Sequence, residues 1–165
     1  MINKFLSLIS FFLVSFFLGH SVFANEQFNF NISEINILED GNKIVGLKRG
    51  EITTNDGLII NADNFVYDKI QNTLLANGNV IIIDNKNDYR ISSEEINYDK
   101  NEEVIYTIGN TLGEINSRYS VSSKDLIFLK NEKILNSNFK TNITDNENQT
   151  FYSLKKFNFD LNSEL

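Results

Sequence analysis

One short sequence pattern recurs at a regular interval along this chain and constrains its fold more than any other feature. The segment Ile60–Lys69 (INADNFVYDK) returns as Ile91–Lys100 (ISSEEINYDK), and weaker copies begin at Val121 and Tyr152. The copies therefore start at nearly constant spacing. A fixed period of roughly 30 residues is typical of stacked architectures, in which each unit buries its apolar face against its neighbours. The sequence therefore predicts a long shared surface rather than a compact catalytic pocket.

The segment Met1–Ala24 differs from the repeats and has the pattern of a secretory signal peptide. Lys4 supplies a positive charge, Phe5–Leu18 is an uncharged apolar run, and small residues precede a cleavage position after Ala24. The alternative, an uncleaved membrane anchor, is disfavoured because the run is shorter than the roughly 20 residues that a membrane span needs. We expect an exported protein with residues 1–24 as the signal peptide and 25–165 as one domain.

The remainder of the chain reads as short β-strands without helices. Ile and Val alternate with polar residues, and Asn, Asp and Gly cluster at turn positions at short, regular intervals. Ile60 and Phe65 are five positions apart, so a straight strand would place them on opposite faces. The same odd step recurs in each copy, which predicts a bend or bulge in every unit. Gly78-Asn79 and Gly109-Asn110, one repeat apart, are the expected corners.

Repeated bent strands that stack antiparallel form a folded-over sheet with two walls. The interior of such a sheet is either an open, groove-like trough or a closed sandwich filled by its own side chains. About nine strands at ~4.8 Å each give a trough of roughly 43 Å. The residues alone leave both forms of the interior open.

Two tandem motifs resemble the organic-solvent-tolerance (OstA-like) family, the periplasmic domains of lipopolysaccharide export. The first is Ala62–Asp68 (ADNFVYD) followed by Leu74–Val80 (LLANGNV), and the second is Ser93–Asp99 (SEEINYD) followed by Gly109-Asn110. The resemblance runs from about Asn31 to the C-terminus. It implies a V-shaped antiparallel β-jellyroll in the periplasm, associated with the outer membrane, with an apolar trough that carries acyl chains while the sugars stay outside.

The resemblance implies three kinds of partner: lipopolysaccharide, other OstA-like jellyrolls that add strand by strand at the sheet edges, and an outer-membrane barrel if the chain is a fragment. Within the family it points to the N-terminal domain of the outer-membrane translocon more than to the free bridge protein, because the last unit lacks a return strand after Phe151–Asp160. The chain has no Cys, whereas the translocon usually carries disulfides. The predicted lipid-lining residues are Ile60, Phe65, Tyr67, Leu74, Ala76, Val80, Ile82, Ile91, Ile96, Tyr98, Val121, Leu126 and Phe128.

Several kinds of chemistry are excluded or weakly supported by composition. Beyond residue 24 there is no His or Cys, which excludes Ser-His and Cys-His sites and metal sites with those ligands. No glycine-rich phosphate loop is present, so we expect no cofactor. Without Lys4 the chain has 14 basic and 22 acidic residues, a net charge of −8, which disfavours nucleic acid as a partner.

Two rival functions come from other classes. One is an adhesin-like or structural β-solenoid, which would form solid apolar ladders. The other is a polysaccharide-active β-helix enzyme, which needs two carboxylates in one groove. Its candidate carboxylates are Asp63, Asp68, Glu94, Glu95 and Asp99. Because Asp68 and Asp99 recur at turn positions, we expect them to form turns and the protein not to be an enzyme.

A separate prediction concerns the basic residues, which could contact lipid phosphates at the rim of a trough. The alternative is an ordinary solvated face. The candidates are Lys48, Arg49, Arg90, Arg118, Lys140, Lys155 and Lys156.

Overall fold

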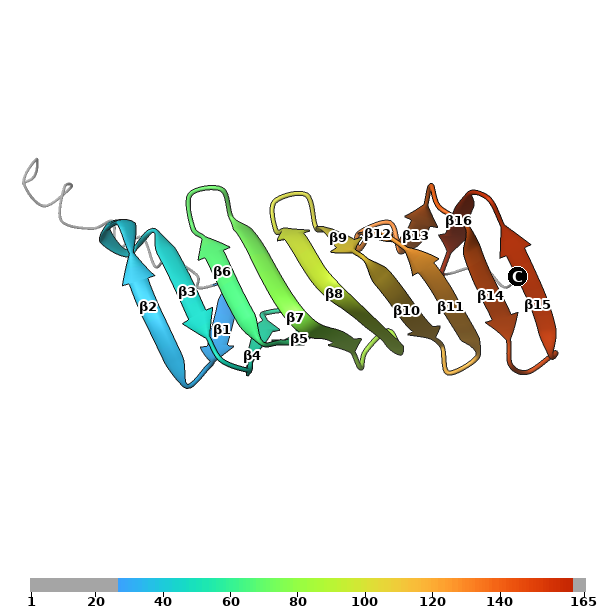
Figure 1. Cartoon of the computed structure of the whole chain (residues 1–165), viewed down its shortest axis with the longest axis horizontal. Helices are drawn as coiled ribbons and strands as arrows, with labels where there is room; N and C mark the ends of the chain where they lie inside the picture. The colour runs from blue at the N-terminus through green and yellow to red at the C-terminus, as the bar shows by residue number, and fades with distance from the viewer. Residues whose placement is uncertain (1–26, 162–165) are drawn as a thin grey trace, which may run out of the picture.

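The computed structural model describes residues 27–161, which form sixteen β-strands in one open antiparallel sheet (Figure 1). The predicted signal peptide, residues 1–24, and the last four residues of the chain lie outside the described part. Within residues 27–161 the only helical element is η1 (Glu39–Gly41), a single 3-10 turn. The described residues therefore contain no helix that is long and apolar enough to cross a membrane. The predicted all-β fold is confirmed.

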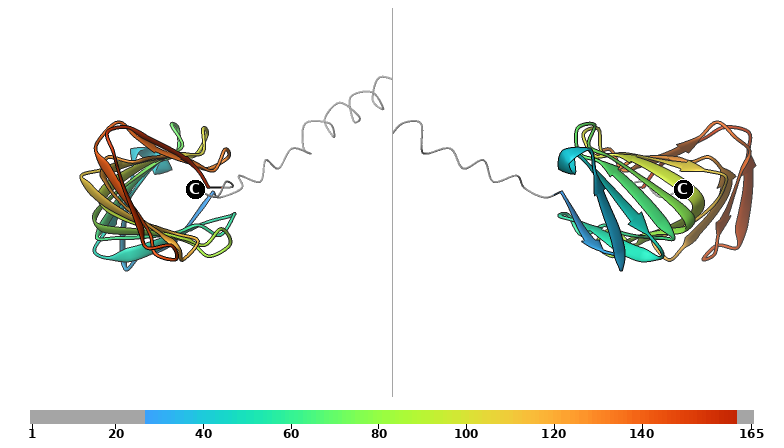
Figure 2. Two further views of the ribbon diagram at one scale, coloured as in Figure 1. Left: turned by 90° about the vertical axis from the view of Figure 1, so that its right-hand side faces the viewer. Right: turned by 60° about the vertical axis from the view of Figure 1, so that its left-hand side comes forward.

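The sheet folds over on itself, so that nine strands contribute to each of two walls (Figure 2). Wall A consists, in order, of β2 (Glu34–Leu38), β3 (Lys43–Leu47), β6 (Asn64–Asp68), the first half of β7 (Thr73–Asp84), the second half of β8 (Tyr89–Asp99), β9 (Val104–Ile108), β12 (Ile127–Leu129), β13 (Ile134–Ser137) and β16 (Phe157–Asp160). Wall B consists of β1 (Phe28–Asn31), β4 (Gly50–Thr54), β5 (Ile59–Ala62), the other halves of β7 and β8, β10 (Asn110–Ile115), β11 (Tyr119–Lys124), β14 (Thr141–Asp145) and β15 (Thr150–Leu154).

The walls join along a line of corners, where the chain passes from one wall to the other. Strand β7 changes register with β8 between Asn77 and Val80, and the Gly78-Asn79 step there has φ angles of 78° and 48°. Gly109, between β9 and β10, repeats the corner with a φ of 88°. These backbone angles favour glycine and asparagine. The predicted bends and both predicted corners are confirmed.

The opposite edge of each wall carries the turns, and aspartate forms many of them. The side chains of Asp68, Asp84, Asp99 and Asp145 each accept hydrogen bonds from the backbone N–H groups two and three residues ahead. This geometry shapes the chain for a tight turn. The turn-forming role expected for Asp68 and Asp99 is therefore confirmed. A further turn at Asn116–Arg118 was not singled out from the sequence.

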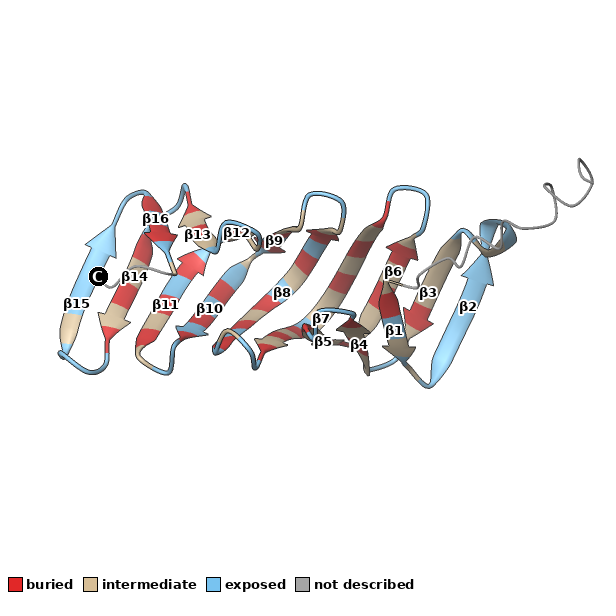
Figure 3. Cartoon of the chain, turned by 180° about the vertical axis from the view of Figure 1, so that it is seen from behind, coloured by how far each residue is buried: buried red, intermediate tan, exposed pale blue. Residues whose placement is uncertain are grey.

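The apolar core lies between the walls, and buried residues alternate with outward-facing ones along the strands (Figure 3). Ile60 and Phe65, five positions apart, are both fully buried. The corner at Asp63 lies between them, between β5 and β6, and turns both side chains toward the same interior. The bend therefore resolves the odd spacing in the sequence.

The two ends of the stack leave interior positions uncovered. Ile37 on β2 pairs with Ile44, which pairs with the buried Tyr67, so Ile37 faces the interior; yet it is 67% exposed. At the other end, Tyr152 on β15 pairs with the buried Ile143 and is 37% exposed. Directly opposite residues share a face of a sheet. The apolar interior therefore opens at both terminal strands.

Candidate functional site

All predicted lipid-lining residues lie inside the folded sheet. Each has at most 8% of its surface exposed, and together with other side chains they form one continuous apolar cluster. The members are Ile60, Phe65, Tyr67, Leu74, Ala76, Val80, Ile82, Ile91, Ile96, Tyr98, Val121, Leu126 and Phe128. Their burial places them between the walls, and their contact with lipid stays a prediction.

Aromatic pairs that the sequence did not reveal connect the two walls. Ring centroids lie 4.8 Å apart for Phe28–Tyr67, 4.9 Å for Tyr89–Phe128 and 5.4 Å for Tyr119–Phe159, each in an edge-on arrangement. The wall B residues of these pairs belong to a series with the same period as the repeats: Phe28, Leu58, Tyr89 and Tyr119. The buried Leu58 takes the place of an aromatic residue in this series. This second periodic series was the sequence signal from which the wall B partners could have been predicted. Edge-to-face pairs of this kind contribute about 0.5–1.5 kcal/mol beyond area burial.

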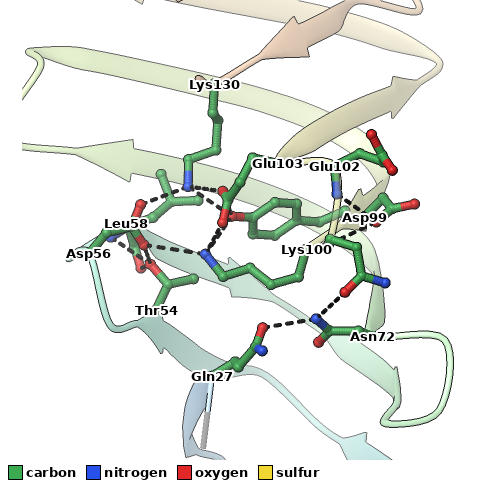
Figure 4. Close-up of polar contacts among 12 residues, drawn as sticks. Gln27, Thr54, Asp56, Leu58, Asn72, Asp99, Lys100, Glu102, Glu103 and Lys130 are labelled. Carbon is green, nitrogen blue, oxygen red and sulfur yellow. Dashed lines mark hydrogen bonds and ion pairs between the residues drawn. The ribbon is translucent and has the colours of Figure 1, made fainter. Parts of the chain in front are cut away.

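The turn-bearing edges of the two walls face each other, and we call the space between them the mouth. In its N-terminal part polar contacts connect the walls. Asn72 Nδ2, at the turn after β6, donates to Gln27 Oε1 before β1 over 2.9 Å, and also to Asn101 Oδ1 (Figure 4). The Tyr67 hydroxyl donates to Asn72 Oδ1. The mouth is therefore closed here by hydrogen bonds.

The next contact along the mouth is an ion cluster formed by Asp56, Lys100, Glu103 and Lys130 (Figure 4). Asp56 follows β4 in wall B, whereas the other three lie on turns of wall A. Lys130 Nζ lies 2.8 Å from Asp56 Oδ2 and 2.7 Å from Glu103 Oε2. It also donates to the hydroxyl of Tyr98 over 2.7 Å. The Lys130 side chain is only 7% exposed, so the cluster is partly shielded from water.

The electrostatics of the ion cluster favour its charged state. Burial raises the pKa of the Asp56 carboxyl, but hydrogen bonds from Lys130 and Thr54 outweigh it and hold that pKa well below its usual range. The same balance holds for Glu103. Burial raises its pKa, but hydrogen bonds from Lys100, Lys130 and Tyr98 outweigh burial, so its pKa is lowered overall. Both carboxyls are therefore ionised at neutral pH. Asp56 attracts Lys100 and Lys130 across the mouth, whereas Glu103 pairs with the same lysines within wall A.

Beyond the ion cluster the mouth widens into a pocket of about 620 Å³. Its floor includes Tyr89, Phe128 and Leu161, and charged and amide side chains surround it. The polar lining residues are Asp56, Asp84, Lys86, Asn87, Asp88, Lys100, Glu103, Asn116, Lys130, Asn131 and Lys133. The interior is thus packed between the walls, as in the predicted closed form, and a polar pocket lies at this part of the mouth.

The hydroxyl of Tyr89 stands out in this pocket. Tyr89 is 5% exposed, and its hydroxyl oxygen is buried beside the Asp84 carboxylate. Burial raises the pKa of this hydroxyl, and the charge of the nearby Asp84 and a hydrogen bond with its carboxylate raise it further. Asp84 itself accepts from the Asn87 side chain and from backbone N–H groups.

The carboxylates that were candidates for the rival enzyme function lie at several places in the fold. Asp63 lies at a corner and pairs with Arg49 Nη1 at 3.0 Å, and Glu94 accepts from Asn110 at another corner. Asp68 and Asp99 lie at wall A turns, and Glu95 lies on β8. Within residues 27–161 no group of three or more His, Cys, Asp or Glu side chains is placed to hold a metal ion.

The structure also redistributes the predicted basic rim. Most of these side chains lie at the corners, on the side opposite the mouth, in the links between β3 and β4, β13 and β14, and β15 and β16; they are Lys48, Arg49, Lys140, Lys155 and Lys156. Arg90 is exposed on β8, and Arg118 pairs with Asp145 at 2.7 Å. The lysines that line the pocket at the mouth are Lys86, Lys100, Lys130 and Lys133. Sequence reasoning missed them because lysines at turns are common on any solvated surface.

Comparison with known proteins finds solved structures with a similar fold but no relative by sequence. No protein-family model and no curated protein matches the chain. Among solved structures, the chain is similar to the crystal structure of LptH from Pseudomonas aeruginosa, described as the LptA-homologous periplasmic component of the lipopolysaccharide transport device. The match has a TM-score of 0.51 and 8% identity, and covers 76% of this chain and 80% of LptH. At this identity the likeness concerns the fold.

Proposed function

We propose that this protein is a non-enzymatic lipopolysaccharide carrier of the OstA-like type, which holds acyl chains between its walls in the periplasm. One observation carries the proposal: the walls enclose a continuous apolar interior that opens at both terminal strands. The fold shared with LptH, a periplasmic lipopolysaccharide transport component, supports the same function. Each CH₂ of an acyl chain that leaves water for such an interior gains about 0.8 kcal/mol.

Lipid entry requires space between walls that are packed in this structure. The walls are joined covalently only through the chain at the corners, and the chain contains no Cys, so the mouth is held by noncovalent contacts alone. Aromatic pairs, the Asn72–Gln27 hydrogen bond and the ion cluster make up these contacts. Separation of the walls at the mouth would expose the interior for an acyl chain without breaking the ladder within either wall.

The open ends of the stack support end-to-end assembly with similar domains. Strands β2 and β15 each pair on one side only, so their outer backbone groups are available for strand addition. The uncovered Ile37 and Tyr152 would then continue the apolar interior into the next domain. An assembly of this kind would extend the path beyond a single stack. Co-purification with an outer-membrane barrel would identify the chain as part of the translocon rather than as a free bridge.

Photo-crosslinking tests the proposal directly. A photoreactive amino acid is placed at the inward-facing Ile37, Phe128 or Tyr152, and at Leu112, which is 58% exposed on β10 and alternates with the inward-facing Thr111 and Gly113. We expect adducts with labelled lipopolysaccharide from the three inward positions and none from Leu112. Circular dichroism confirms the fold of each variant. Adducts from Leu112 alone, or from no position in folded protein, would reject the carrier function and favour an adhesin-like role.

A further inference from the structure

The line of corners, opposite the mouth, changes its charge from one end of the stack to the other. The fourth and fifth positions of the four repeat copies are, in order, Asp63-Asn64, Glu94-Glu95, Lys124-Asp125 and Lys155-Lys156. The formal charges of these pairs are therefore −1, −2, 0 and +2. All four pairs lie at corners, where the chain passes between wall B and wall A. Equivalent positions of one fold thus carry opposite charge at the C-terminal end.

The return corners change in the same direction. The glycine-asparagine steps at Gly78 and Gly109 are followed, 30 residues after the second, by Phe139-Lys140. At the first two corners a carboxylate lies against the glycine, so that a Cβ on either glycine would come within 2.7 Å of a carboxylate oxygen. At the last corner the ammonium group of Lys124 lies 5.6 Å from the centre of the Phe139 ring. A glycine beside a carboxylate is therefore replaced by an aromatic ring beneath a lysine.

These changes create one basic surface, which we call the C-terminal corner patch. It consists of five exposed residues: Lys124, Phe139, Lys140, Lys155 and Lys156. Among residues 27–161, none of its four lysines forms an ion pair with a carboxylate. The basic corner at the other end of the stack differs, because Arg49 there pairs with Asp63 at 3.0 Å. Asp125 accepts a hydrogen bond from the backbone of the preceding corner. The patch thus presents four cations on a chain whose net charge beyond residue 24 is −8.

The composition of the patch favours a membrane over an acidic protein as its partner. All four cations are lysines, which act as hydrated point charges and lack the fork of arginine that recognises a single carboxylate in two places. Interfaces between proteins are depleted in lysine and enriched in arginine. Phe139 is 44% exposed among these lysines. An aromatic ring beside several cations is suited to the boundary between lipid headgroups and acyl chains.

We propose that the C-terminal corner patch binds the surface of a membrane that contains anionic lipids. The four lysines lie at the layer of lipid phosphates, and the Phe139 ring enters the headgroup region. The rest of this acidic chain is repelled by the same surface, so contact at one end of the corner line fixes the orientation of the stack. The open end at β15 is held near the membrane, and the mouth faces away from it. The proposal concerns the outer surface and does not require acyl chains between the walls.

Vesicle flotation tests this binding. The chain from Asn25 onward is mixed with vesicles of phosphatidylcholine alone, or of equal parts of phosphatidylcholine and phosphatidylglycerol. We expect flotation with the anionic vesicles only, and its loss at high salt because screening weakens the attraction. Equal flotation with both kinds of vesicle would overturn the proposal, since uptake of acyl chains into the interior does not depend on headgroup charge. Retention on immobilised poly-glutamate without flotation would overturn it in favour of an acidic protein partner.

Variants assign the binding to the patch. Lys155→Glu with Lys156→Glu restores the charge of the second copy, and we expect about tenfold or more weaker binding to anionic vesicles. Phe139→Ser keeps all four lysines and should weaken binding about threefold or more, with the salt dependence retained. The matched control is Lys69→Glu with Lys86→Glu, two exposed lysines at turns on the side of the mouth. It changes the net charge equally and should weaken binding far less.

Circular dichroism verifies the fold of each variant. Equal weakening in the two double variants would reduce the effect to net charge and overturn the assignment to the patch. Binding of Phe139→Ser at the strength of the parent would overturn the contact between the ring and lipid. Failure of flotation leaves the carrier function intact, because photo-crosslinks from the interior report acyl chains and not the corners.

Discussion

Asp56 is the residue on which the ion cluster depends, because it is the member contributed by wall B. Its side chain is half exposed, so solvent screening limits its contribution to stability. Asp56→Asn is expected to lower the free energy of unfolding by about 1 kcal/mol. Lys130 keeps Glu103 as a partner, which prevents a larger loss. Urea unfolding followed by circular dichroism measures the change, with Asp40→Asn as a surface control on η1.

The pH dependence of stability follows from the same pair of carboxyls. Folding lowers the pKa of Asp56 below its usual 3.8 and that of Glu103 below its usual 4.5. A carboxyl with a lowered pKa in the folded state stabilises above its unfolded pKa, and this contribution is lost as pH falls through the folded value. Between about pH 5 and about pH 3 the parent should therefore lose more stability than the Asp56→Asn, Glu103→Gln double variant. Parallel slopes for the two proteins would contradict this interpretation.

At the scale of one strand, the corner decides whether a repeat can fold over. A Cβ on Gly78 would lie 2.7 Å from Asp63 Oδ2, and its φ of 78° already disfavours other residues. Gly78→Ala should therefore lower the free energy of unfolding by about 1–3 kcal/mol. Gly113→Ala is the control, because its Cβ would meet Val121 at an ordinary 3.6 Å. Thermal unfolding by circular dichroism compares the two, and equal melting temperatures would exclude a special role for the corner.

Elements that repeat were predictable from the sequence, and contacts between walls were not. The odd step from Ile60 to Phe65 required a bend, and the structure has a corner there because both residues must reach one interior. The pairing of Tyr89 with Phe128 joins residues that lie far apart in the chain, in different repeats. Such pairing depends on the stagger of one wall against the other, which local periodicity does not encode. The pocket at the mouth depends on the same stagger, so the sequence did not indicate it.

At the scale of the whole molecule, the uncovered ends predict association of copies head to tail. Tyr152→Lys places a charge on the inward side of edge strand β15, so self-association should weaken about tenfold or more. Phe151→Lys, on the outward side of the same strand, adds the same charge at 63% exposure and should have a smaller effect. Analytical ultracentrifugation over a concentration series measures both. A parent that stays monomeric throughout would contradict end-to-end assembly of this chain with itself.

Separation of the walls is the motion that the carrier function requires, and it can be blocked chemically. In a variant with Asp56→Cys and Lys130→Cys, a short bis-maleimide linker would join wall B to wall A across the mouth, where the ion cluster joins them now. If acyl chains enter through the mouth, linking should reduce lipopolysaccharide adducts from a probe at Phe128 several-fold. The matched control joins Gln71→Cys to Asn101→Cys, two stacked turns within wall A whose parent residues share a hydrogen bond of 3.1 Å. Adduct yields that fall equally in both linked proteins would indicate general damage, and yields that fall in neither would show that lipid enters through the open ends, where Ile37 and Tyr152 are exposed.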